Sequence, residues 1–103
     1  MNYQIRPLTL NPDQLSGLSS RLITSHHENN YAGAVKRLNA LRGELAALDW
    51  NAAATFTING LKREELIAAN SAFLHELYFD NLGGVPACCL PAGCPLRSRA
   101  TLA

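Results

Sequence analysis

The sequence predicts an all-α protein: a long antiparallel helical hairpin with an extended N-terminal arm and an irregular C-terminal tail. Two segments, residues 20–48 and 61–82, contain no proline and repeat apolar residues at steps of three or four. A connection rich in small residues separates them. The chain has 103 residues and is 48% hydrophobic, which is enough for a folded core.

The N-terminal residues are predicted to be extended and then to turn into the first long helix. Pro7 blocks a helix within residues 2–10. Four apolar side chains of this arm are available for packing: Tyr3, Ile5, Leu8 and Leu10. Pro12 suits the first position of a one-turn helix that Gly17 ends. Ser19 is a good N-cap for the first long helix, because its hydroxyl can accept an unpaired backbone N–H.

The first long helix is predicted from Ser20 to Leu48. A helix of this length would extend about 43 Å and needs a partner along its length. Its stripe contains Leu22, His26, Asn30, Ala34, Leu38, Leu41, Leu45 and Leu48.

The second long helix is predicted from Leu61 to Leu82. Asn59-Gly60 is a turn signal, with Asn59 as a candidate N-cap. Glu64 and Glu65 then suit the positive end of the helix dipole, and Gly83 suits a left-handed C-cap. The stripe of this helix contains Leu66, Ile67, Asn70, Phe73, Leu74, Leu77, Tyr78 and Leu82.

Composition argues against several classes of partner. The net charge of +1 indicates no strong polyanion, so nucleic acid is not expected. No apolar run approaches the roughly 18 residues of a membrane span. The first residues lack the basic-then-apolar layout of a signal peptide, so we expect a cytoplasmic protein without a membrane partner.

The tail, residues 85–103, differs from the rest of the chain. It holds all three cysteines, three prolines and no acidic residue. Cys88, Cys89 and Cys94 lack the paired Cys-x-x-Cys spacing of zinc sites. We expect this tail to be irregular, either disordered or encoded by a shifted reading frame.

Two histidines, His26 and His75, are candidate metal ligands. They are 75 − 26 = 49 residues apart with their midpoint in the connection, so antiparallel helices would bring them to similar heights. From spacing alone, the alternative is a pair of core histidines satisfied by hydrogen bonds. His27 points about 100° away from His26 and is expected on the surface or just behind a ligand. A dinuclear carboxylate site needs Glu-x-x-His motifs, and none occurs.

Two motifs resemble the iron/manganese superoxide dismutases. The first helix of that family reads roughly His-His-Gly-Lys-His-His-Gln-x-Tyr-Val-x-x-Leu-Asn. Residues 26–39 align with it without a gap and read His-His-Glu-Asn-Asn-Tyr-Ala-Gly-Ala-Val-Lys-Arg-Leu-Asn. The family's second ligand lies in Asn-His-Thr-Phe-Tyr-Trp-x-x-Leu, and residues 74–82 read Leu-His-Glu-Leu-Tyr-Phe-Asp-Asn-Leu. Residues 5–8 also resemble the family's proline-containing arm, so the resemblance covers residues 3–84.

The resemblance implies that His26 and His75 bind one Fe or Mn ion. The implied reaction is the dismutation of superoxide, a small-molecule substrate, to dioxygen and hydrogen peroxide. Hydrogen bonds from surrounding residues to the ligands would tune the reduction potential of the ion.

Several positions depart from the family pattern. Asn30 and Ala34 occupy the positions of a histidine and a gateway tyrosine of the family. Tyr31, close to both positions, is the candidate to replace them next to the ligands. Ser71 stands where iron-type enzymes have glutamine and manganese-type enzymes have glycine, so the choice between iron and manganese stays open.

The largest departure concerns the ligand set. The complete family has an α/β half that supplies an aspartate and a third histidine from an Asp-x-x-x-His motif, which this sequence lacks. We interpret residues 1–84 as a superoxide dismutase-like hairpin domain, cut short, and residues 85–103 as its tail. We expect a homo-oligomer or a separate C-terminal half, and negligible activity of the chain alone. The alternative is a metal-free hairpin that acts as an interaction module.

Overall fold

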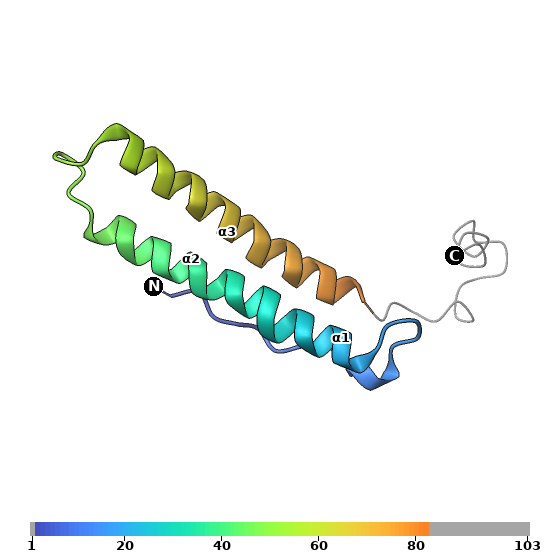
Figure 1. Ribbon diagram of the computed structural model, residues 1–103. Coiled ribbons are helices and arrows are strands. Elements are labelled where there is room, and N and C mark those ends of the chain that lie inside the picture. Colours follow the sequence, from blue (N-terminus) through green and yellow to red (C-terminus); the bar gives the residue numbers. More distant parts are fainter. Residues whose placement is uncertain (1, 83–103) are drawn as a thin grey trace.

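A computed structural model describes residues 2–82 and confirms the all-α hairpin (Figure 1). The extended arm leads into a 3₁₀ turn, η1 (Pro12–Gln14). A continuous helical run follows, made of α1 (Ser20–Ser25), the π-helical turn η2 (His26–Tyr31) and α2 (Ala32–Ala47). The last helix, α3 (Thr55–Asn81), returns antiparallel to this run. No strand occurs among residues 2–82.

Side-chain caps begin the first two elements, and the cap at Ser19 confirms a prediction. The Asn11 side chain accepts the N–H of Asp13 at 3.0 Å and so begins η1. Between the two caps, Gly17 has a φ of +88°, a conformation that glycine adopts without strain. Ser19 Oγ then accepts the N–H of Leu22 at 3.1 Å and so begins α1.

The predicted start of the second helix at Leu61 is wrong, because α3 begins at Thr55. The Asn59-Gly60 pair lies inside the helix and forms no turn. Ala54 is the N-cap residue, and its carbonyl accepts the N–H groups of Thr57 and Ile58 at 3.0 and 3.2 Å. One glycine costs a helix interior only about 1 kcal/mol, which packing of this 27-residue helix against α2 outweighs.

Two predictions concern residues beyond position 82 and lie outside the described residues: the Gly83 C-cap and the irregular tail over residues 85–103. Within the described part of the chain, no helix is long and apolar enough to cross a membrane.

The core lies between large side chains of α2 and small side chains of α3. On α2, Val35 and Leu38 are 1% and 0% exposed. On α3, Ala68 and Ala72 face them at 2% and 0% exposure, and small residues let the two helices approach closely. Phe79 closes the core at the end next to η2.

The stripe predicted for the second helix is therefore wrong as a core-facing surface. Six of its residues remain 40–63% exposed: Leu66, Ile67, Phe73, Leu74, Leu77 and Tyr78. The buried row lies on the opposite side of α3, at Ala68, Ala72 and Phe79. The size of an apolar side chain is a poor guide to its burial in α3, because alanines make the close contact with α2.

The prediction that Glu64 and Glu65 lie at the start of the helix is wrong, because α3 begins at Thr55. The two carboxylates instead form ion pairs with α2. Arg37 forms an ion pair with Glu64. Arg42 Nε lies 3.5 Å from Glu65 Oε1. The two pairs join the helices on a solvated side, where each contributes up to about 1 kcal/mol.

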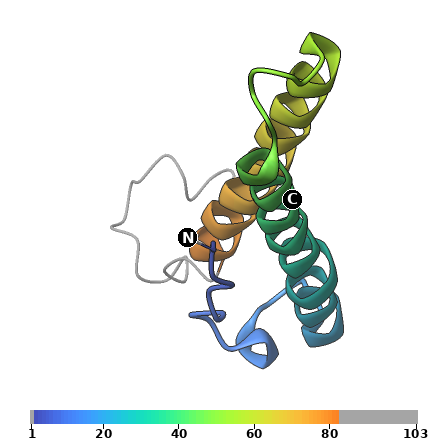
Figure 2. The ribbon, with the colours of Figure 1, turned by 90° about the vertical axis from the view of Figure 1, so that its left-hand side faces the viewer.

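The arm is fixed to both long helices. Tyr3 N–H donates to Asn39 Oδ1 at 2.7 Å, and Asn39 Nδ2 donates to the Tyr3 carbonyl at 2.8 Å. The Tyr3 ring lies 5.4 Å from the ring of Phe73, so the arm also contacts α3 (Figure 2). Three of the four apolar arm residues pack on the core as predicted, whereas Ile5 is 41% exposed.

Candidate metal centre

A π-helical turn, η2, carries three of the residues that build the site. The N–H of Ala32 reaches the carbonyls of Asn29 and His27, and the second is five residues back. In an α-helix, residues five apart point about 140° away from each other. Bonding from i to i+5 aligns them instead, so η2 turns His26 and Tyr31 toward α3 together.

The same turn shifts the buried row of the first helix. Ile23 is the buried residue before η2, and Tyr31 and Val35 follow it. Leu22 and Asn30, two members of the predicted stripe, stay exposed. Periodicity cannot show this shift, because a stripe with one constant helical period does not include the wider turn of a π-helix.

The hairpin brings His26 and His75 together, as the spacing predicts. Their ring centroids lie 4.9 Å apart, with the ring planes at 79°. His75 lies 75 − 55 = 20 residues after the start of α3, and His26 lies 47 − 26 = 21 residues before the end of α2. The two residues reach the same height because α3 begins earlier than predicted.

His26 is half-buried among aromatic rings. Its ring centroid lies 5.2 Å from those of Tyr78 and Phe79. Burial lowers the pKa of His26, and the neighbouring His75 lowers it further. The neutral imidazole, which has a free nitrogen lone pair for a metal, is therefore favoured.

One tautomer of His75 is fixed by its own helix. Nδ1 lies 2.6 Å from the backbone carbonyl oxygen of Ser71. A carbonyl only accepts, so Nδ1 carries the proton and Nε2 keeps its lone pair. Metal-binding histidines are commonly oriented by such a bond from the second ring nitrogen.

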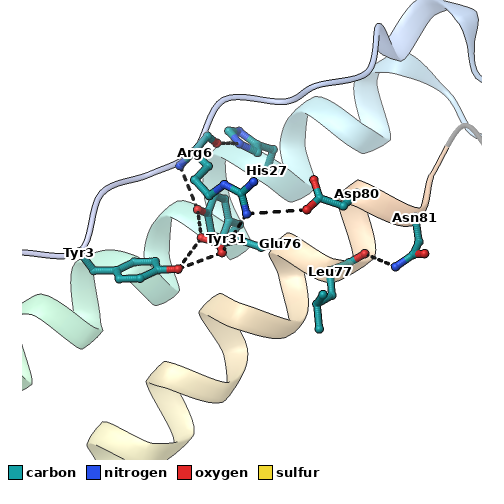
Figure 3. A network of polar contacts seen from close by, with 8 residues as sticks. All are labelled: Tyr3, Arg6, His27, Tyr31, Glu76, Leu77, Asp80 and Asn81. Carbon is teal, nitrogen blue, oxygen red and sulfur yellow. Dashed lines mark hydrogen bonds and ion pairs between the residues drawn. The ribbon is translucent and has the colours of Figure 1, made fainter.

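A partly buried carboxylate next to His75 joins the arm to both helices (Figure 3). The Glu76 side chain is 11% exposed and accepts the hydroxyls of Tyr3 at 2.9 Å and Tyr31 at 2.7 Å. Arg6 Nη1 lies 3.4 Å from Glu76, and Arg6 N–H donates to the Tyr31 oxygen at 3.0 Å. Asp80 extends the network, with its Oδ2 3.7 Å from the same Arg6 nitrogen.

Tyr31 and His27 lie on the arm side of the histidine pair. Burial raises the pKa of Tyr31 to about 12; the Arg6 N–H opposes this rise and Glu76 adds to it. His27 lies behind Tyr31, with ring centroids 5.1 Å apart, and its Nε2 lies 2.8 Å from the Arg6 carbonyl. His27 thus holds the arm in place.

An open groove of about 340 Å³ lies between α2 and α3 and reaches Ser71, whose carbonyl holds His75. Small side chains line much of it, and its polar lining comes from Asn30, Arg37 and Ser71. Three positions that depart from the family pattern line this groove, namely Asn30, Ala34 and Ser71, whereas Tyr31 does not.

Within residues 2–82, no third His, Cys, Asp or Glu joins the pair in a group that could hold a metal ion. The residues present fit part of a coordination set: two imidazoles, one favoured in its neutral form and one with a fixed tautomer. The three cysteines lie outside the described residues.

Comparison with known proteins gives one informative match. The chain is 63% identical over 83 residues to superoxide dismutase [Fe] of Cupriavidus metallidurans. The match covers 81% of this chain and 42% of the relative, so the chain spans less than half the length of the curated relative it matches. No family model matches the chain, and no solved structure does.

Proposed function

Because the chain belongs to the iron/manganese superoxide dismutase family over the residues that match, we propose that His26 and His75 are two ligands of one redox-active metal ion. The observation that carries the proposal is the facing pair of imidazoles, 4.9 Å apart on opposite helices. Iron is the first candidate, since the relative is named as an iron enzyme. Manganese is the second candidate, because Ser71 matches neither the glutamine of iron-type enzymes nor the glycine of manganese-type enzymes.

The proposed reaction is the conversion of two superoxide ions and two protons to dioxygen and hydrogen peroxide. The bound ion would supply the one-electron chemistry of this reaction. In this proposal, His26 and His75 donate nitrogen lone pairs. The Ser71 carbonyl keeps Nδ1 of His75 protonated and so leaves Nε2 free as the donor atom.

Two further groups of residues have proposed roles around the pair. The groove lined by Asn30, Arg37 and Ser71 is the proposed approach for the small anion. Tyr31 is proposed as a positioning residue. Its hydroxyl bonds Glu76, the residue next to His75, and so holds the turn of α3 that carries this ligand.

Two imidazoles make half of the four protein ligands that the resemblance implies. We propose that the other ligands come from outside residues 2–82, either from a longer chain or from a separate one. The hairpin alone is then expected to have negligible dismutase activity, because it lacks an anionic ligand to balance the charge of a trivalent ion. The identity to a dismutase favours this proposal over a metal-free interaction module.

Metal content of single-histidine variants tests the proposal. The purified chain is loaded with Fe²⁺ under anaerobic conditions or with Mn²⁺, desalted, and analysed for metal. We expect His26→Gln and His75→Gln to lose the bound metal. His27→Gln is the matched control, because it also removes one histidine but lies outside the pair, and it should keep the metal. Equal metal content in all three variants, or no bound metal in the unchanged chain, would refute the proposal that His26 and His75 are ligands.

A superoxide-consumption assay tests the predicted lack of activity separately. We expect the loaded chain to match a His26→Ala, His75→Ala double variant. Activity near that of a complete family member, abolished in the double variant, would show that this chain completes a working site.

A further inference from the structure

The first turns of α3 extend past the packed part of the hairpin. Leu61 is the first residue of α3 that packs against the core, and the ion pairs with α2 begin at Glu64. Before them, Phe56 is 81% exposed. Figure 1 shows this start of α3 beside the connection, at the end of the hairpin away from α1. Few buried apolar contacts therefore oppose local unfolding of residues 55–60.

The start of α3 also lacks the groups that commonly stabilise the N-terminus of a helix. Its N-cap residue is Ala54, which has no side-chain oxygen to accept an N–H, and its first turn contains no acidic residue. Helix ends of this kind open at a lower cost in free energy than packed segments do. We therefore expect α3 to unwind between Thr55 and Leu61 more often than in its packed part.

Asn59 and Gly60 lie in this weakly held start and can react with each other. The backbone nitrogen of Gly60 can attack the side-chain amide carbon of Asn59, because glycine has no Cβ to shield that nitrogen. Both residues are exposed, and no atom of another segment lies within 4 Å of a Cβ added at Gly60. The surrounding protein therefore does not block the approach.

The helix itself prevents this reaction while it is folded. In an α-helix, the N–H of Gly60 donates to the carbonyl of Phe56, four residues earlier. Helical side chains also tilt toward the N-terminus of the helix, which turns the amide of Asn59 away from the next backbone nitrogen. The reaction therefore needs Asn59 to leave the helical conformation, and its rate follows the fraction of time for which the start of α3 is unwound.

We propose that Asn59 is a site of spontaneous deamidation whose rate is controlled by unwinding of the first turns of α3. The Gly60 nitrogen forms a bond to the amide carbon of Asn59 and gives up its proton, and the amide nitrogen leaves as ammonia. Water then opens the resulting five-membered imide at either carbonyl, giving aspartate or isoaspartate. One water is consumed and one ammonia is released, with no change of oxidation state and no cofactor.

The two products change the start of α3 in different ways. Both add one negative charge, so the formal net charge falls from +1 to +1 − 1 = 0. Aspartate at this position lies near the positive end of the helix dipole, which favours the helix. Isoaspartate adds one carbon atom to the backbone and so breaks the helical hydrogen-bond register. The second product shortens α3 to its packed part, from Leu61 onward.

The inference does not depend on the proposed metal ligands. Asn59 lies 75 − 59 = 16 residues before His75. At the rise of an α-helix, that separation is about 24 Å along the axis. The reaction at Asn59 therefore proceeds whether or not the histidine pair holds an ion.

Deamidation rates in the folded and the unfolded chain test the proposal. The whole chain is kept in neutral buffer or in guanidinium chloride, with reductant present because it contains three cysteines. Peptide mass spectrometry follows the replacement of the Asn59 amide by an acid. We expect the reaction to be about 10–100-fold slower in buffer, which corresponds to ~1.4–2.8 kcal/mol for unwinding.

Asn70 is the internal reference, because it is also exposed but lies between the packed residues of α3 and is followed by Ser71. Each rate in buffer is divided by the rate of the same residue in guanidinium chloride. We expect Asn70 to be suppressed at least about tenfold more than Asn59, because the packed part of a helix opens at a higher cost in free energy. Equal suppression would mean that both residues react only after the whole chain unfolds.

A new N-cap tests whether unwinding starts at the first turn. Ala54 has a φ of −65° and a ψ of 140°, the extended conformation that a capping serine adopts. We expect Ala54→Ser to slow the reaction of Asn59 in buffer by about fivefold, the factor that ~1 kcal/mol of cap stabilisation gives, and to leave its rate in guanidinium chloride unchanged. Ala52→Ser is the matched control, because it makes the same change outside the cap position, and it should leave both rates unchanged.

Three results would overturn the proposal. The first is an equal rate for Asn59 in buffer and in guanidinium chloride, the second is equal suppression of Asn59 and Asn70, and the third is a rate in buffer that Ala54→Ser does not change.

Discussion

The imidazoles of His26 and His75 face each other across the hairpin with their ring centroids 4.9 Å apart. Two local features produce this pairing. The early start of α3 at Thr55 brings the residues to the same height, and η2 turns His26 toward α3. On the opposite side, the network around Glu76 ties the arm to the turn that carries His75. The stability of the site can therefore be tested through residues that are not candidate ligands.

The first prediction concerns the carboxylate of Glu76. Replacing it in Glu76→Gln removes the charged acceptor shared by Tyr3, Tyr31 and Arg6. Hydrogen bonds to a charged group contribute more than neutral ones, and the Glu76 side chain is only 11% exposed, so we expect a loss of about 2–3 kcal/mol in the free energy of unfolding. Urea denaturation followed by circular dichroism measures it.

Asp80→Asn is the matched control for that substitution. Asp80 pairs with the same guanidinium, but at 3.7 Å and with its side chain 44% exposed. Exposed ion pairs contribute little, so we expect a loss below about 1 kcal/mol. If Glu76→Gln and Asp80→Asn lower the free energy of unfolding equally, the lower exposure of Glu76 does not strengthen its interactions.

The pairing of His26 and His75 was predictable from sequence only in part, because the midpoint between them falls in the connection. Their equal heights also need the start of α3 at Thr55, which lies before the predicted start at Leu61. The network behind them was not predictable. Glu76 reads as an ordinary exposed acid on a helix, and its partners Tyr3 and Arg6 lie about 70 residues away in an arm without periodicity.

The two wrong predictions about α3 have distinct physical causes. Asn59-Gly60 is a turn signal only when the flanking chain changes direction, and here helix packing outweighs the local preference. The predicted core-facing row is wrong because large apolar residues do not mark the core in α3. Alanines at positions 68 and 72 make the contact instead, and the large residues lie on the outer face. The π turn has no sequence signature that we can identify.

The second prediction concerns pH. Tyr31 has a pKa of about 12 in the folded chain, against about 10 for an ordinary tyrosine. Between these values the unfolded chain has lost the proton and the folded chain still holds it. The contribution of Tyr31 to stability is therefore complete below pH 10 and falls as the pH rises toward 12, by on the order of 2 kcal/mol.

Unfolding measured from pH 9 to 12 should show this fall in the unchanged chain and a smaller one in Tyr31→Phe. Tyr78→Phe is the control, because Tyr78 is 40% exposed, and its pH dependence should follow that of the unchanged chain. Parallel curves for the unchanged chain and Tyr31→Phe would contradict the burial argument.

The third prediction tests the close helix contact. Ala72 is 0% exposed and faces α2, so Ala72→Leu inserts three carbon atoms where no space is available. Overpacking of this kind costs about 1–3 kcal/mol. Ala46→Leu makes the same change at an exposed position of α2 and should alter the free energy of unfolding by less than about 0.5 kcal/mol. Equal effects at both positions would place Ala72 outside the core.

The last prediction distinguishes a helix from a turn at Gly60. The structure places this glycine inside α3, without a positive φ and with no atom within 4 Å of an added Cβ. Alanine is the better residue in such a position, because it loses less backbone entropy on folding. We expect Gly60→Ala to raise the free energy of unfolding by about 0.5–1 kcal/mol. Gly17→Ala is the matched control, since Gly17 has a φ of +88° that alanine rarely adopts, and it should lower the free energy of unfolding by at least about 1 kcal/mol. A loss of stability in Gly60→Ala, similar to that of Gly17→Ala, would mean that Asn59-Gly60 forms a turn and that α3 begins after it. In that case His75 would lie closer to the start of its helix, and the equal heights that bring it opposite His26 would need another cause.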